Sequence, residues 1–417
     1  MPLANGRQYL AIPGPSVMPD EVLKAMHRAS PNIYKGELHD LTHSLIPDLK
    51  YVAQTEAHVA IYIGNGHSAW EASLMNVTSR GDTVLVAEAG SFGKGWAEMA
   101  DAMGLTAEIL SFSEDGPVDP QGIEDALRKD TKGKIKAVLV CHVDTSTGGK
   151  SDIAAIRAAM DAAGHDALLM VDCIASLGCD RYEMDAWGID VTVSACQKGL
   201  MTPAGLAFVH FNDKAMARRG DNVSRYWDWS LRVDPEVYFM HFNGTAPTHH
   251  LYGLRVALDM IKEEGIKNVW ARHEGLAQMI WAALETWAQD GPMKINVPDR
   301  TARSWAVTSV FAGPGNGLAL QDWCETQTGL TLGIGLGREP SDAYYRIGHM
   351  GHVNAHMIMG VLGTIGGGLT ALGIPHGQGA LQAAADELAR HTPVKRSDQL
   401  IQAKGNHSNP EPASQCC

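Results

Sequence analysis

The sequence predicts an α/β protein whose larger part is built on a mainly parallel sheet. Short unbroken apolar runs at 137–141 and 167–171 are typical of strands that are buried on both faces. An alanine-rich segment of helical period, 153–163, lies between them. Strands that alternate with helices in this way favour a parallel sheet with helices on both of its faces.

Further elements extend this alternation along the chain. We expect strands at 59–63 and 83–87, because both runs are short and apolar. Each is followed by a segment of helical period, at 69–77 and 95–103. A strand at 206–210 follows a turn marked by proline and glycine, so we expect the chain to return to the sheet there.

The rest of the chain predicts a smaller C-terminal α/β domain. Residues 251–289 are strongly helical, and a new block begins after the turn at 290–292. This block contains an expected strand at 306–311, a helix at 317–327 and a strand end near Arg346, before a glycine-rich helical finish. We therefore divide the chain into an N-terminal arm (1–15), a large domain (16–289), a small C-terminal domain (290–394) and a disordered tail without apolar periodicity (395–417).

Composition limits the class of partner. The chain has 417 residues, of which 45% are hydrophobic, and its formal net charge of −13 argues against nucleic acid or an anionic membrane as the main partner. It opens on no signal-peptide pattern, and none of its apolar runs reaches membrane-spanning length. The seven cysteines lack paired zinc spacing and are typical of reduced thiols. We therefore expect a cytoplasmic protein.

Two charged residues at the ends of apolar runs carry the chemistry. Lys198 follows a run that ends near Cys196, and Asp172 closes the run at 168–171. Pyridoxal 5'-phosphate (PLP) chemistry requires this pair, because a lysine amine forms a Schiff base with the cofactor aldehyde and a carboxylate keeps the pyridine nitrogen protonated. Each residue alone is also explained by an ordinary turn or helix cap, so the interpretation depends on the residues around them.

Three more segments place polar or aromatic residues just past an apolar run. The turn Gly-Asn-Gly-His-Ser at 64–68 precedes a helix, where glycines and free N–H groups let the backbone approach an anion. It is neither a P-loop nor a full GxGxxG motif, which disfavours nucleotide binding. Phe92 can stack on a flat ring, and the hydroxyls at 142–148 can reach a ring oxygen. Ligands gather at the carboxyl ends of strands in open α/β sheets, so we expect these segments to converge.

Arg346 is the candidate that binds substrate. Arginine offers a planar, bidentate fork that suits the α-carboxylate of an amino acid. A surface ion pair is the alternative explanation for this residue. The apolar and tight flank Ile347-Gly348 favours the carboxylate clamp.

These motifs together resemble the class V aminotransferases of fold type I. Within this family, the sequence most resembles the alanine–, serine– and aspartate–glyoxylate aminotransferases and pyridoxamine–pyruvate aminotransferase. The resemblance implies a fold type I PLP-dependent transferase, with a large domain around a mainly parallel sheet plus a smaller C-terminal α/β domain, and a homodimer with active sites at the interface. It spans roughly residues 12–390 and is carried by Pro13-Gly14-Pro15, residues 64–72, Val171-Asp172, residues 194–205 and Arg346-Ile347-Gly348.

The resemblance also implies a role for each matched residue. Lys198 is the Schiff-base lysine and the proton shuttle, Asp172 pairs with the pyridine nitrogen, and Phe92 stacks on the ring. Gly14 and Arg346 bind the substrate. The implied cofactor-binding set is Gly66, His67, Ser68, Phe92, Thr145, Asp172, Ile174, Gln197, Lys198 and, from a partner chain, Thr245.

The implied reaction moves an amino group from alanine, serine or aspartate to a small 2-oxo acid such as glyoxylate or pyruvate, by ping-pong chemistry through pyridoxamine phosphate. Pyridoxamine–pyruvate transamination, with the vitamin itself as substrate, is the alternative. The chain departs from the family at Phe242, where a tyrosine is frequent, and at Ala204, where a second proline is frequent. Residues 30–34 also replace the His-Arg-rich segment of many glyoxylate enzymes.

Two other classes have some support in the sequence. A cysteine-desulfurase-like lyase needs a nucleophilic cysteine on a mobile loop, and Cys324 lies 22 residues before Arg346, but in an expected helix. His349, His352 and His356 have spacings that fit one helix face, yet the sequence shows no fourth ligand, so we expect no metal site.

Overall fold

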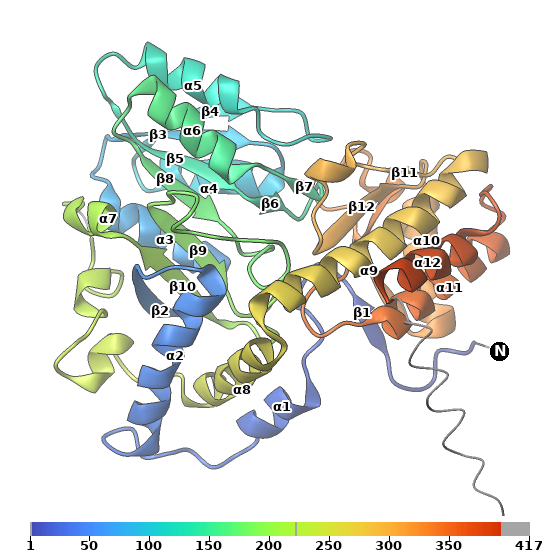
Figure 1. Cartoon of the computed structure of the whole chain (residues 1–417), viewed down its shortest axis with the longest axis horizontal. Coiled ribbons are helices and arrows are strands. Elements are labelled where there is room, and N and C mark those ends of the chain that lie inside the picture. Colours follow the sequence, from blue (N-terminus) through green and yellow to red (C-terminus); the bar gives the residue numbers. More distant parts are fainter. Residues whose placement is uncertain (1, 222, 393–417) are drawn as a thin grey trace, which may run out of the picture.

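A seven-stranded sheet forms the centre of the larger domain in the computed structural model, which describes residues 2–221 and 223–392 (Figure 1). All neighbouring strands are parallel except at one strand, which is antiparallel to both of its neighbours. That strand is β10, the returning strand expected from the sequence. The order across the sheet is β2 (His58–Gly64), β10 (Gly205–Phe211), β9 (Val191–Ala195), β8 (Leu168–Asp172), β5 (Ile135–Cys141), β3 (Thr83–Glu88) and β4 (Thr106–Ser111).

Helices cover both faces of this sheet, as the apolar strands require. In β8, Leu168 and Met170 join one core and Leu169 and Val171 join the other, so every side chain of the strand is buried. The helices α3 (Gly66–Val77) and α4 (Ser91–Ala102) cover the first face. The opposite face is covered by α2 (Glu37–Ala53), α5 (Pro120–Lys129), α6 (Ile153–Ala163) and α8 (Thr248–Glu264).

The smaller domain is a five-stranded sheet with helices packed on it. Its order is β1 (Tyr9–Ala11), β13 (Leu330–Ile334), β14 (Tyr344–Gly348), β12 (Val307–Phe311) and β11 (Lys294–Ile295). Its helices are α9 (Ile266–Trp287), α10 (Asn316–Thr328), α11 (Ala355–Ala371) and α12 (Ala380–His391).

The arm and one long helix connect the two domains. The expected arm supplies β1, which pairs parallel with β13 of the smaller sheet. Helix α9 crosses from one domain to the other, and its second half, from Leu276 to Trp287, packs in the smaller core (Figure 1). The boundary predicted at residue 289 therefore lies after a helix that both domains share.

Most expected elements lie where the periodicity places them, and the differences have local causes. Helix α6 has the predicted bounds, because Asp152 caps its first turn and Gly164 ends it in the left-handed region. Helix α4 begins at Ser91 rather than at residue 95, since the distant Asp144 carboxylate accepts hydrogen bonds from its first N–H groups. The helical stretch from 251 to 289 is broken at Gly265, whose φ is +83°.

Several elements were not expected from the sequence. They are the strands β1, β4, β11 and β13, the helices α1 (Asp20–Met26), α2, α5 and α7 (Asp213–Ala217), and the hairpin of β6 (Val143–Asp144) and β7 (Gly149–Lys150). Short 3-10 turns at Trp229–Leu231, Tyr238–His241, Ala288–Asp290, Arg300–Ala302 and Ser341–Ala343 complete the fold. The tail predicted to be disordered, 395–417, lies outside the described residues.

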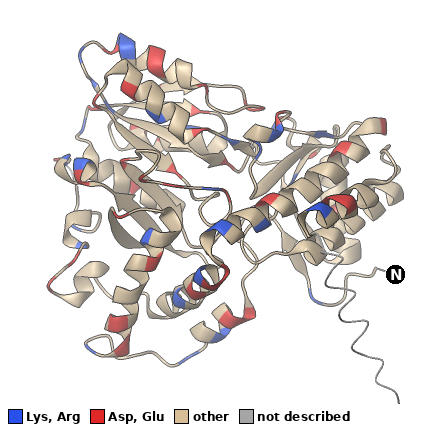
Figure 2. Ribbon diagram, in the orientation of Figure 1, with Lys and Arg blue, Asp and Glu red and all other residues tan. Residues whose placement is uncertain are grey.

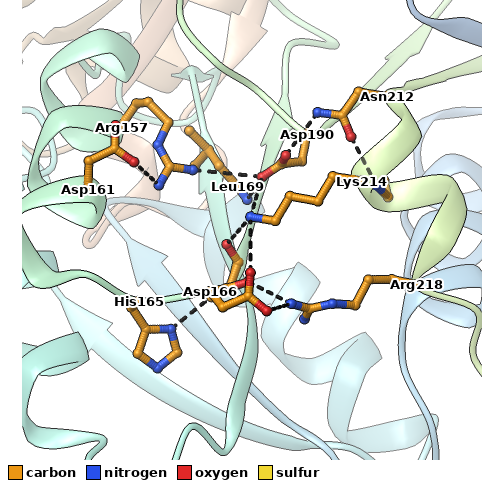
Figure 3. Close-up of polar contacts among 11 residues, drawn as sticks. Arg157, Asp161, His165, Asp166, Leu169, Asp190, Asn212, Lys214 and Arg218 are labelled. Carbon is orange, nitrogen blue, oxygen red and sulfur yellow. Dashed lines mark hydrogen bonds and ion pairs between the residues drawn. The ribbon is translucent and has the colours of Figure 1, made fainter.

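Charged side chains gather on the outer helices, while the strands carry few (Figure 2). A group of charged side chains also forms a network near the amino ends of β8 and β9, which we call the amino-edge network (Figure 3). It consists of Arg157, Asp161, Asp166, Asp190, Lys214 and Arg218. Across the part of the chain that is described, none of the helices is both long enough and apolar enough to cross a membrane.

Candidate active site

A cavity of about 200 Å³ opens at the carboxyl ends of the strands of the large sheet, where the sequence places its candidates. Its walls come from the turn before α3, the start of α4, the β6 hairpin, the end of β8 and the turn after β9. The lining residues are Asn65, Gly66, His67, Trp70, Phe92, Val143, Thr145, Asp172, Ile174, Ala175, Gln197 and Lys198. The predicted segments therefore converge on one site.

Asp172 is the last residue of β8 and lies at the inner wall of this cavity. Its Oδ1 accepts the backbone N–H of Ile174 at 2.7 Å, and its Oδ2 accepts the indole N–H of Trp70 at 2.8 Å. Only 3% of the residue is exposed, and burial raises the pKa of its carboxyl to about 7, although both hydrogen bonds favour the charged form. The carboxylate is therefore held by neutral donors, without a direct ion-pair partner among the described residues.

Lys198 lies in the turn between β9 and β10, and its amine points into the same cavity. Its Nζ donates a hydrogen bond to the carbonyl oxygen of Pro13. Burial, and then the charge of Arg346, lower the pKa of this amine to about 8. The backbone carbonyl of Lys198 also accepts the Ser16 hydroxyl at 2.7 Å, so the arm fixes the turn that carries the lysine.

Gly14 must be glycine for this contact to exist. Its φ of +98° lies in the region that L-residues rarely adopt. A Cβ at this position would lie 2.4 Å from the Nζ of Lys198. The residue predicted to touch the substrate therefore lies directly against the candidate Schiff-base lysine.

The turn at 64–68 opens α3 as expected for an anion site. Asn65 caps the helix by accepting the backbone N–H of His67 at 3.1 Å. At Gly66, a Cβ would lie 2.3 Å from Ile174, so glycine permits the close approach of the turn to the end of β8. The Ser68 hydroxyl donates to the Asn65 carbonyl at 2.6 Å and does not line the cavity.

Two buried polar atoms of the cavity wall lack a hydrogen-bond partner among the described residues. They are Oγ1 of Thr145 and Oε1 of Gln197. An unsatisfied buried polar group costs about 1–3 kcal/mol, so such groups are retained where a ligand completes them. Asp172 and Lys198 line the same cavity, and together with them these two atoms fit a flat, polar cofactor such as PLP.

Arg346 lies on β14 of the smaller sheet and reaches across to the large domain. Its Nε donates to the carbonyl of Ile334 at 2.7 Å and its Nη1 to the carbonyl of Thr145 at 2.9 Å. The side chain is buried, which lowers the pKa of its guanidinium to about 10. Among the described residues, Arg346 forms no ion pair, although the Asp144 carboxylate stabilises its charge from a longer distance. Its remaining N–H groups are therefore available to a bound anion.

Other candidates lie away from the cavity. Thr245 is exposed and outside the lining set, and its role at a partner chain's site stays a prediction. Phe242 is completely buried in the main core. Cys324 is buried in α10, where burial raises the pKa of its thiol to about 12, so it is no mobile-loop nucleophile. His349 is buried between Trp305 and Thr308.

The sequence interpretation missed Trp70 and Asp144. Trp70 lies one helical turn after Gly66, so the period of α3 places both on the cavity side, and this spacing is the signal that was available. Asp144 holds the start of α4 with the N–H groups of Phe92 and Gly93 at 2.8 and 3.3 Å. No local pattern indicates that contact, because the partners are 52 and 51 residues apart.

Comparison with known proteins agrees with this geometry. The family model described as aminotransferase class-V matches residues 8–335. The chain is 35% identical to the serine–glyoxylate aminotransferase of Methylorubrum extorquens over 94% of this chain and 98% of the relative. It is 33% identical to the L-aspartate–glyoxylate aminotransferase of Paracoccus denitrificans, over 91% and 96% of the two chains. The crystal structure of pyridoxamine–pyruvate aminotransferase from Mesorhizobium loti superposes with a TM-score of 0.84 at 25% identity, covering 94% of this chain and all of that one.

Proposed function

The chain belongs to the class-V aminotransferase family, and from that premise we propose that it uses PLP to move an amino group from a small amino acid to a small 2-oxo acid such as glyoxylate or pyruvate. The observation that carries this proposal is the meeting of Lys198 and Asp172 in one buried cavity with two unpartnered polar atoms. Alanine, serine and aspartate are the proposed donors.

Different residues of the cavity are proposed to contact different parts of the cofactor. Asp172 is proposed to hold the proton on the ring nitrogen, and Phe92 to lie against the ring. Thr145 is proposed to bond near the ring hydroxyl, and Ile174 to contact the cofactor. Gly66, His67 and Gln197, which line the cavity, are proposed to bind the phosphate together with Ser68, which lies outside the lining. When bound, PLP supplies an aldehyde that condenses with amines and a ring that withdraws electrons from the substrate α-carbon.

Lys198 is the proposed general base at the substrate α-carbon. A lysine can accept a proton only when its amine is neutral, and burial brings the pKa of this amine to about 8. Near neutral pH, a useful fraction is therefore unprotonated. The Pro13 carbonyl gives the protonated amine a hydrogen-bond acceptor inside the cavity, so the proton is held close to the reacting atoms.

Arg346 is proposed to orient the substrate by its carboxylate. Two of its N–H groups are used by backbone carbonyls from both domains, which fixes the plane of the guanidinium. The remaining N–H groups and the buried charge then favour an anionic group. Gly14 leaves the room that the substrate needs beside Lys198.

A homodimer in the cytoplasm is the proposed working form. Thr245 lies in a segment whose exposed surface includes the large apolar residues Val237 and Phe239, each about half exposed. Such side chains favour burial against another chain. A second copy seated there would bring Thr245 to the phosphate end of its neighbour's site.

Free pyridoxamine as substrate is the second candidate, and two observations favour it. The Ser68 hydroxyl donates its proton to the Asn65 carbonyl, and Phe242 has no hydroxyl. Both features reduce the donors available to a phosphate at the helix start. The turn at 64–68 still presents backbone N–H groups to an anion, which favours PLP.

The visible absorption spectrum tests both candidates. We expect purified protein with PLP to show a visible band that is absent from Lys198→Ala. The band should be lost on single additions of alanine, serine or aspartate, and the most effective amino acid is the donor. A protein that shows the band only with free pyridoxal would support the second candidate, and absence of any band would refute both.

A further inference from the structure

Trp70 lies in the cavity wall, and its side chain reaches Oδ2 of Asp172. Its indole N–H donates to Oδ2 at 2.8 Å, while Oδ1 is already bonded to the backbone of Ile174. Trp70 is 1% exposed and lines the cavity with Asp172. The carboxylate is therefore held at both oxygens, and one of its two donors is a side chain.

Neighbouring aromatic rings fix the direction of this N–H group. The indole of Trp70 stacks on that of Trp96 with ring centroids 5.6 Å apart and an interplanar angle of 13°. The rings of His67 and Phe92 lie edge-on to it, with centroids 4.7 and 6.3 Å from the centroid of the Trp70 ring. Packed on three sides, the indole cannot turn its N–H away from Asp172.

Trp96 provides an internal comparison. It is as buried as Trp70 and belongs to the same core, yet its indole N–H has no hydrogen-bond partner among the described residues. The two stacked tryptophans differ in their surroundings: Trp70 lines the cavity and donates its N–H to a carboxylate, whereas Trp96 lies behind it and does neither. Trp96 shows that a tryptophan can pack in this core without a hydrogen bond from its indole N–H.

We propose that Trp70 is a positioning residue for the reaction, which fixes the orientation of Asp172 and favours its charged form so that the carboxylate can hold the proton of a pyridine nitrogen. This inference rests on the proposed use of PLP. A hydrogen bond to the charged form of an acid favours that form. Without it, burial would leave the carboxyl protonated over a wider pH range, and a protonated carboxyl would not offset the charge of a protonated ring nitrogen.

Other titratable groups also lie around Asp172. Lys198 favours the charged carboxylate and Asp144 opposes it. The thiols of Cys141 and Cys173 and the phenol of Tyr182 are buried, and their pKa values are raised, so they stay neutral. Within residues 2–221 and 223–392, the Trp70 N–H is thus the one side-chain group that donates a hydrogen bond to this carboxylate.

The backbone N–H of Ile174 reports the ionisation of Asp172 without any cofactor. We would label the full-length chain with 15N-isoleucine, assign Ile174 by its loss in Ile174→Val, and follow its resonance from pH 5 to 9. The wild-type midpoint should lie near 7. In Trp70→Phe the midpoint should rise by about one pH unit, which is a tenfold change in the protonation equilibrium. Trp96→Phe is the matched control and should leave the midpoint unchanged.

The proposal is wrong if Trp70→Phe and Trp96→Phe give the same midpoint, or if the Ile174 resonance still titrates in Asp172→Asn. Should Trp70→Phe fail to fold, 15N-indole labelling of the unmutated chain gives the same answer. The Trp70 signal must then titrate with the Ile174 midpoint and stop doing so in Asp172→Asn.

Binding of PLP separates this inference from the proposed function. At pH 6, below both midpoints, Trp70→Phe should weaken PLP binding about tenfold, since the charged fraction of Asp172 falls by that factor. Trp96→Phe should change the binding less than twofold. If the wild-type chain does not bind PLP, the proposed function fails, whatever the titration shows. If it binds PLP and the two variants bind equally, only the role of Trp70 is refuted.

Discussion

The two ends of strand β8 differ in whether their charged residues form ion pairs. At its amino end, the amino-edge network matches acids with bases: Arg218 and Lys214 meet Asp166, and Arg157 lies between Asp161 and Asp190 (Figure 3). At its carboxyl end, Asp172 is bonded only to neutral donors, and the nearby Lys198 is bonded to a carbonyl.

The difference shows how a structural network is told from a site. Paired charges at the amino edge compensate one another and join the ends of β8, β9 and β10 to their helices. Buried charges without an ion partner destabilise the fold, and the pKa shifts of Asp172 and Lys198 record that cost. Such groups persist where a ligand makes use of them. Charge alone therefore does not mark the active site, whereas uncompensated burial does.

The largest effect is expected at Lys198. Lys198→Ala should reduce transamination by more than a thousandfold, because covalent and general-base catalysis are both lost. Steady-state rates with each donor measure this effect. Lys214→Ala, at the amino edge, is the matched control and should keep the wild-type rate per folded molecule. A Lys198→Ala enzyme that still transaminates would remove the basis of the comparison.

Asp190→Ala tests the amino-edge network. Its carboxylate is 6% exposed, accepts the N–H of Leu169 at 2.8 Å and the Asn212 amide at 2.9 Å, and lies near Arg157. Its removal should lower the free energy of unfolding by about 3 kcal/mol, as for other broken buried pairs. Urea unfolding measures the loss, and kcat/KM of the folded fraction should not change. Asp161→Ala, which removes an exposed partner of Arg157, should have little effect.

Arg346→Lys sharpens the role of the buried arginine. The charge remains, but the planar fork is lost, so KM for the amino acid should rise roughly 30-fold while PLP binding is retained. Steady-state kinetics and the visible band measure the two quantities separately. Arg300→Lys, on the exposed surface of the smaller domain, is the control. A loss of PLP binding in Arg346→Lys would place the arginine at the cofactor instead.

The smallest effect concerns stability and its dependence on pH. The folded pKa of Asp172, about 7, exceeds its ordinary value of 3.8, so the folded chain without cofactor loses stability as pH rises between these values. Asp172→Asn removes that cost, so we expect this variant to be more stable than the wild-type chain at pH 8 and no more stable at pH 4. Thermal unfolding at both pH values measures the difference. Equal stabilities at pH 8 would show that the buried charge is compensated after all.

Much of the fold could be predicted because its signals are local. The apolar runs of β5 and β8 and the period of α6 depend only on alternation along a few residues. Elements that were missed lack such a signal: β4 is an edge strand with mostly exposed residues, and α5 has few apolar positions. The expected convergence of the 64–68 turn, Phe92, Asp172 and Lys198 is confirmed by the cavity.

The sequence by itself determined which chemistry is available, by placing Lys198 and Asp172 after buried strands of a parallel sheet, whose carboxyl ends share one edge. Only the tertiary structure decided how those groups are held. Trp70 meets Asp172 across 102 residues, Lys198 meets Pro13 across 185, and Arg346 meets Thr145 across 201. A hydrogen bond depends on direction to within tens of degrees, and the packing of distant helices and strands sets that direction.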